Sequence, residues 1–133
     1  MSAPVRNEVS NPLVGTWRLV SWEVKKADGG VQLPFGQNLA GYLGYTRHGR
    51  MSAFMRLRDK FVFYAGTYDI EGNEVTHHVS VADRLSTEGM DLVRTLSISG
   101  NRLTLLTAEP PPRTLVEDTA TGDTSLLTWV RVP

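Results

Sequence analysis

The chain has 133 residues, of which 41% are hydrophobic, and its 14 Lys and Arg residues balance its 14 Asp and Glu residues. This length supports one compact domain with a single core. A net charge of zero, without a long basic block, argues against nucleic acid or an anionic membrane as a partner. The lack of cysteine excludes disulfides, thiolate nucleophiles and cysteine-based metal sites.

Residues 1–12 are polar and contain two prolines, so we expect a flexible N-terminal arm, followed by one domain over 13–133. The arm lacks the apolar core of a secretory signal. No run approaches the roughly 18 apolar residues that a membrane-spanning helix needs. Together with the lack of cysteine, these features lead us to expect a cytoplasmic protein.

The remaining chain consists of short runs rich in β-branched and aromatic residues, each ended by turn residues. The runs lie at approximately 13–26, 31–34, 40–46, 50–57, 62–70, 74–82, 90–99, 102–108, 113–118 and 124–132. None has a sustained helical period, and the segments best suited to a short helix or an irregular lid are 34–41 and 83–89. The prolines at 110–112 mark a loop. The pattern predicts antiparallel strands joined by tight turns.

Three hairpins test this interpretation, because a turn determines which residues face each other. The expected pairs are Ile98–Leu103, Leu96–Leu105 and Arg94–Thr107 about Gly100-Asn101; Ile70–Val75, Tyr68–His77, Gly66–Val79 and Tyr64–Val81 about Gly72-Asn73; and Thr46–Met51, Gly44–Ala53 and Tyr42–Met55 about His48-Gly49. Each hairpin then has one apolar and one polar face. Such alternation suits a sheet that closes on itself with its apolar face inward.

Both ends of this series resemble the calycin group, which includes the lipocalins. The first run carries Gly15-Thr16-Trp17, and Gly-x-Trp at the head of the first strand is typical of these barrels. The last run ends near Arg131. In calycins an arginine of the last strand packs on the first-strand tryptophan and closes the base of the barrel. The resemblance implies this structural role for Gly15, Trp17 and Arg131.

For Arg131 to reach Trp17, the last strand must run antiparallel to the first, so the number of strands must be even. We therefore expect an all-β fold, a closed antiparallel up-and-down β-barrel of 8–10 strands with a central cavity. Ten strands are favoured, with 31–34 counted as one; eight remain if two short runs are loops. Trp17 then marks the closed end, and the pair Tyr68–His77 falls near the opposite, open end.

Internal motifs are similar to the lipocalin-like domain family of bacteria and fungi. They are Gly41-Tyr42-Leu43-Gly44-Tyr45-Thr46, Gly49-Arg50-Met51-Ser52-Ala53 and Thr76-His77-His78-Val79. The similarity extends over roughly 13–132 and is specific as to fold. Because members of this family are mostly of unassigned function, it implies little about activity.

The expected interior contains polar residues that a plain core does not need, and each must find a partner or cost about 1–3 kcal/mol. The expected ligand-binding residues are Tyr42, Met51, Met55, Tyr64, Tyr68, His77, Arg94, Thr107 and Glu23. An inward position of Glu23 has an alternative, because Trp22 and Val24, whose side chains point to the opposite face of the strand, form an apolar set. A bend in the first strand would send Trp22 inward and Glu23 outward.

His77 and Arg94 could carry chemistry. An imidazole titrates near neutral pH and can move a proton in either direction, and Tyr68 across the ladder could be its partner. Alternatively, His77 and Tyr68 satisfy each other in a packed core. An inward Arg94 needs an acidic or enolic ligand, or Glu23; alternatively a β-bulge turns it outward or it extends to the barrel rim.

Two functions compete, with a third as the structural alternative. The first is binding of a small, largely hydrophobic molecule in the barrel. The second is a cofactor-independent isomerase, cyclase or lyase acting on a small natural-product-like substrate, with His77, Tyr68 and Arg94 as catalytic residues. The third is an interaction protein with a filled interior. We expect no cofactor and no metal, since His77 and His78 point to opposite faces of one strand.

Overall fold

A computed structural model describes residues 11–109, 115–116 and 119–133. Residues 1–10 of the predicted arm, the prolines at 110–112 and most of the predicted run 113–118 lie outside the described residues. Among the residues that the structure describes, no helix is long and apolar enough to cross a membrane.

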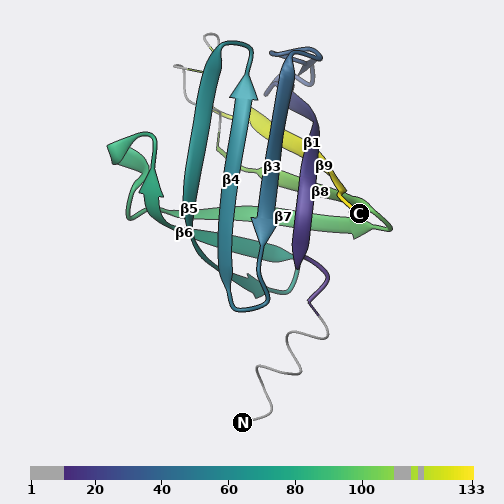
Figure 1. The fold of residues 1–133 in the computed structure, drawn as a ribbon. Helices are drawn as coiled ribbons and strands as arrows, with labels where there is room; N and C mark the ends of the chain where they lie inside the picture. The colour runs from purple at the N-terminus through teal and green to yellow at the C-terminus, as the bar shows by residue number, and fades with distance from the viewer. Residues whose placement is uncertain (1–10, 110–114, 117–118) are drawn as a thin grey trace.

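The described part of the chain forms nine strands and one short 3₁₀ helix. They are β1 (Gly15–Lys25), β2 (Val31–Gln32), β3 (Leu39–Tyr45), β4 (Arg50–Leu57), β5 (Lys60–Glu71), β6 (Glu74–Ala82), η1 (Leu85–Thr87), β7 (Asp91–Ser99), β8 (Arg102–Thr107) and β9 (Thr124–Arg131). Every strand pairs with its neighbours in antiparallel fashion, and β9 returns to pair with β1. In Figure 1, β3, β4 and β5 stand upright while β7 and β8 run across them, as expected for a sheet curved into a barrel.

The predicted closed up-and-down β-barrel is confirmed, with eight strands in its wall. The favoured count of ten is wrong, because β2 is only two residues long and pairs with the end of β1. The next barrel strand, β3, lies directly beside β1. Counting 31–34 as a full strand reverses the direction assigned to the strands after it. The hairpin between β5 and β6 therefore lies at the same end as Gly15 and Arg131, and not at the open end as predicted.

Two of the three predicted hairpin registers are largely correct. About Gly100-Asn101 the pairing holds through Leu96–Leu105, although the ladder ends before Arg94. The hairpin between β5 and β6 also pairs as predicted as far as Gly66. A β-bulge there shifts the register by one residue, so Ala82, rather than Val81, faces Tyr64.

The third hairpin, between β3 and β4, is shifted by one residue along β3. Its connection comprises residues 46–49, so Tyr45, rather than Thr46, faces Met51. A one-residue slip turns every side chain of a strand to the other face. The predicted interior position of Tyr42 is therefore wrong: its side chain lies outside and is 56% exposed, while Tyr45 is buried.

The structure brings Gly15, Trp17 and Arg131 together at the base of the barrel. The Arg131 guanidinium lies 4.2 Å from the centre of the buried Trp17 ring, a cation–π contact. It also donates hydrogen bonds to the carbonyl oxygens of Pro12 (2.7 Å) and Val14 (2.9 Å). A Cβ atom at Gly15 would lie 2.8 Å from Arg131 Nη1, and φ there is +136°, so glycine is required.

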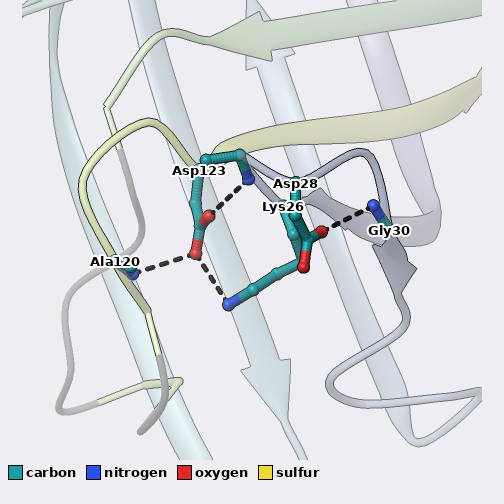
Figure 2. Close-up of polar contacts among 6 residues, drawn as sticks. Lys26, Asp28, Gly30, Ala120 and Asp123 are labelled. Carbon is teal, nitrogen blue, oxygen red and sulfur yellow. Dashed lines mark hydrogen bonds and ion pairs between the residues drawn. The ribbon is translucent and has the colours of Figure 1, made fainter.

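At the opposite end, the carboxylate of Asp123 joins two loops (Figure 2). It lies 2.8 Å from Lys26 Nζ and accepts the backbone N–H groups of Ala120 (2.9 Å) and Ala27 (3.0 Å). These groups, led by Lys26, lower the pKa of the Asp123 carboxyl. The carboxylate thereby ties the loop after β1 to the turn that precedes β9.

We expect Gly66→Ala to lower the free energy of unfolding by about 2–4 kcal/mol. The added Cβ would lie 1.9 Å from the carbonyl oxygen of His78, so the bulge between β5 and β6 has to open. Urea denaturation measures the change. The matched control is Gly44→Ala, where the Cβ would meet Ser52 Oγ at an ordinary 3.6 Å. Equal costs for both variants would contradict this packing.

We expect Asp123→Asn to lower the thermal midpoint at neutral pH, because the amide loses the charge that pairs with Lys26. Since the pKa of Asp123 is lowered on folding, its stabilising effect is present above the unfolded carboxyl pKa and is lost as the pH falls through the folded pKa. The difference between variant and wild type should therefore shrink in acid. Thermal melts across the acidic range test this, with Glu71→Gln at an exposed site as the control. A difference independent of pH would count against the ionic role.

Candidate functional site

A cavity of about 340 Å³ lies inside the barrel, within the size range of small-molecule sites. Its wall is largely apolar and includes Leu43, Met55, Val62, Leu105 and Leu127. Residues of the segment 83–90, which contains η1, line its mouth at the end away from Trp17. The interior is therefore hollow between a sealed base and an open rim.

Both segments predicted as a short helix or irregular lid lie at this rim. Segment 83–89 contains η1 and is held to β6 by Glu88, whose carboxylate accepts the Ala82 N–H at 3.1 Å. In the segment 34–41, turns occupy 34–37 and β3 begins at Leu39. Phe35 from these turns is buried edge-on against Trp22, with ring centres 5.4 Å apart.

His77 lines the cavity from β6 and is almost fully buried. Its Nε2 lies 2.6 Å from the Tyr45 hydroxyl and its Nδ1 lies 2.9 Å from the Tyr64 hydroxyl. Burial, aided by the charges of Arg94 and His78, lowers the pKa of His77 from 6.5 to about 3. The imidazole is therefore neutral at neutral pH.

A neutral imidazole has one donor and one acceptor nitrogen, so His77 donates one of these hydrogen bonds and accepts the other. Burial raises the pKa of Tyr45 and Tyr64, so both keep their protons. Among the described residues, His77 is the hydrogen-bond partner of the buried Tyr45 hydroxyl. One of the two tyrosine hydroxyls therefore donates to the imidazole and the other accepts from it, and the tautomer of His77 determines which. In the tautomer with its proton on Nδ1, the Tyr64 hydroxyl keeps its own proton for the cavity that Tyr64 lines.

Tyr68 faces His77 across the ladder as predicted, but its hydroxyl bonds elsewhere. It donates to the carbonyl oxygen of Thr46 at 2.6 Å and accepts from Asn11 Nδ2 at 2.9 Å. The Tyr68 side chain thus points toward the base of the barrel. The role expected for it beside His77 is filled by Tyr45 and Tyr64, of which Tyr45 was missed because of the register shift in β3.

Arg94 lines the cavity and is half-buried. The ladder between β6 and β7 is regular where Arg94 faces Val75, so no bulge turns it outward. Its charge and a side-chain hydrogen bond oppose the effect of burial on the pKa of Tyr64. The side chain also makes a 3.3 Å hydrogen bond to the Val93 carbonyl.

Of the five remaining residues that were expected to bind ligand, three line the cavity and two do not. Met55, Tyr64 and Thr107 line the cavity. Met51 is buried near the base, beside Tyr45. Glu23 is only half-buried and follows a β-bulge between Leu19 and Ser21, which sends Trp22 into the wall in its place.

Trp129 is a cavity residue that the sequence analysis did not identify. It is 2% exposed, lines the cavity from β9, and its Nε1 is a buried donor without a hydrogen-bond partner among the described residues. Its alternation with Leu127 and Ser125 in the last strand is a signal that could have found it. Trp22 differs, since its Nε1 donates to Ser125 Oγ at 3.0 Å.

His78 points to the outer face, opposite to His77. Its Nε2 lies 2.7 Å from an Asp69 oxygen and its Nδ1 lies 2.8 Å from an Asp91 oxygen. Hydrogen bonds to Asp91 and Asp69 raise the pKa of His78. Two adjacent histidines thus have opposite shifts, because one lies in the cavity wall and the other lies between surface carboxylates.

Comparison with known proteins supports the fold. Residues 14–60 match the family described as lipocalin-like domain. A lipocalin-like protein from Bacteroides uniformis is 19% identical, with 90% of this chain and 98% of that chain covered and a TM-score of 0.53. An uncharacterized protein from Bacteroides eggerthii is 12% identical, with coverage of 87% and 98% and a TM-score of 0.50. A redesigned β-barrel is 14% identical, with coverage of 91% and 92% and a TM-score of 0.50. No curated protein matches the chain.

We expect the two histidines to titrate far apart in imidazole NMR spectra recorded across the pH range. His77 should stay neutral down to about pH 3, and His78 should keep its proton above the ordinary 6.5. Because the folded state binds fewer protons at His77 than the unfolded state, this residue lowers stability as the pH falls from 6.5 toward 3. The variant His78→Gln assigns the signals. Coincident titration near pH 6.5 would contradict the buried tyrosine–histidine arrangement.

Proposed function

Because the chain is a lipocalin-like barrel with a cavity open at one end, we propose that it binds a small, largely hydrophobic molecule in that cavity. The observation that carries this proposal is the cavity itself, with about 340 Å³ of space, mainly apolar walls and a few polar groups. An apolar ligand gains about 25 cal/mol for each Å² that it removes from water. The few polar groups then orient it.

The geometry favours binding over acid–base chemistry at His77. A general acid or base works best when its pKa lies near the operating pH, and burial lowers the pKa of His77 to about 3. The Tyr68 hydroxyl, which the isomerase or cyclase hypothesis requires beside His77, donates instead to Thr46. The open cavity also favours binding over the third alternative, an interaction protein with a filled interior.

Filling the cavity should abolish binding. We expect wild type to enhance the fluorescence of the apolar probe N-phenylnaphthylamine, and Met55→Trp, which adds a bulky ring to the wall, to remove that enhancement. The matched control is Phe54→Trp, one residue away on the outer face, which should leave probe binding unchanged. Circular dichroism verifies that both variants fold. Equal probe binding by wild type and Met55→Trp would place the probe outside the cavity and contradict the proposal.

A further inference from the structure

The cavity contains a buried hydrogen-bond donor without an acceptor. Trp129 Nε1 has no partner among the described residues, although its side chain lies against the cavity. A buried polar group left unpaired costs about 1–3 kcal/mol, so an arrangement of this kind calls for an acceptor. Because Nε1 itself is buried, a molecule in the cavity supplies this acceptor if the indole shifts toward it.

Arg94 is a second donor on the same wall. In the part of the chain that the structure describes, the carboxylates in ion pairs are Asp123, Asp69 and Asp91, and none of them pairs with Arg94. The carboxylate-bearing residues that line the cavity, Asp83 and Glu109, are exposed at its mouth. The guanidinium of Arg94 thus lines the cavity without a carboxylate counter-ion from the described residues.

Tyr64 is the third donor when His77 carries its proton on Nδ1, because the Tyr64 hydroxyl then accepts from the ring and its own proton remains available. Arg94 acts on the same hydroxyl, since burial raises the pKa of Tyr64 while the charge of Arg94 and a hydrogen bond with it act to lower that pKa. The three residues line one cavity from β5, β7 and β9.

We propose that the bound molecule is a carboxylic acid whose carboxylate accepts hydrogen bonds from Arg94, Tyr64 and Trp129, with its apolar body against Met55, Leu105 and Leu127. This inference rests on the proposed function and adds the chemical class of the ligand. Arginine matches the planar carboxylate, and hydrogen bonds to an ionised group are roughly twice as strong as neutral ones. A cationic head group would be repelled by Arg94, and a neutral alcohol would leave its charge uncompensated.

Three ten-carbon probes with the same chain test the proposal: decanoate, decanol and decylamine, each titrated calorimetrically into the full chain. We expect decanoate to bind most tightly and Arg94→Gln to weaken it by about tenfold or more, with decanol affected less than about threefold. Tyr64→Phe and Trp129→Phe should each weaken decanoate selectively, and they keep the test valid if Arg94→Gln does not fold. The control is Arg102→Gln, on the outer face of β8.

The outcomes separate the two proposals. Decanol binding as tightly as decanoate, with Arg94→Gln affecting neither, would overturn the carboxylate inference and leave hydrophobic binding standing. Preferential binding of decylamine would also overturn the inference alone. If none of the three probes binds wild type, the proposed hydrophobic ligand fails and the inference fails with it.

Discussion

Eight residue pairs join β1 to β9, and this ladder turns an open sheet into a barrel with an inside. Closure removes the exposed edges that an open antiparallel sheet would present for association. It also requires β9 to run antiparallel to β1, which brings Arg131 back over Trp17 and seals the base. The cavity can then open only at the other rim, where the loops tied together by Asp123 lie.

A buried polar side chain in a closed apolar interior is costly unless it has a hydrogen-bond partner, and the polar side chains of this wall differ in whether they have one. His77 is satisfied completely, with a tyrosine hydroxyl on each ring nitrogen. Among the described residues, Trp129 Nε1 has no partner, and Arg94 has the Val93 carbonyl oxygen as a partner and no carboxylate. Both groups are donors, and the proposed carboxylate ligand would supply the acceptor that they lack.

Much of this fold follows from residue pattern, and the errors have one physical source. Gly-x-Trp, Arg131 and the tight Gly100-Asn101 turn predicted the barrel, its base and one hairpin. Register elsewhere depends on loop length and bulges, which the side-chain pattern determines weakly. The connection between β3 and β4 is one residue longer on the β3 side than predicted, so Tyr45 rather than Tyr42 faces the interior. The two-residue β2 was counted as a wall strand, which placed His77 at the wrong end.

The contrast between His77 and His78 shows which residue governs the chemistry of the cavity. Surface carboxylates hold a proton on His78, whereas burial and the nearby Arg94 keep His77 neutral. Of His77 and Arg94, it is therefore Arg94 that carries positive charge at the cavity wall, while His77 holds Tyr64 through a hydrogen bond. Any reaction supported here would develop negative charge against Arg94 and Tyr64, rather than pass a proton through the imidazole. The proposed binding thus depends on one electrostatic feature, the guanidinium that has no carboxylate partner among the described residues.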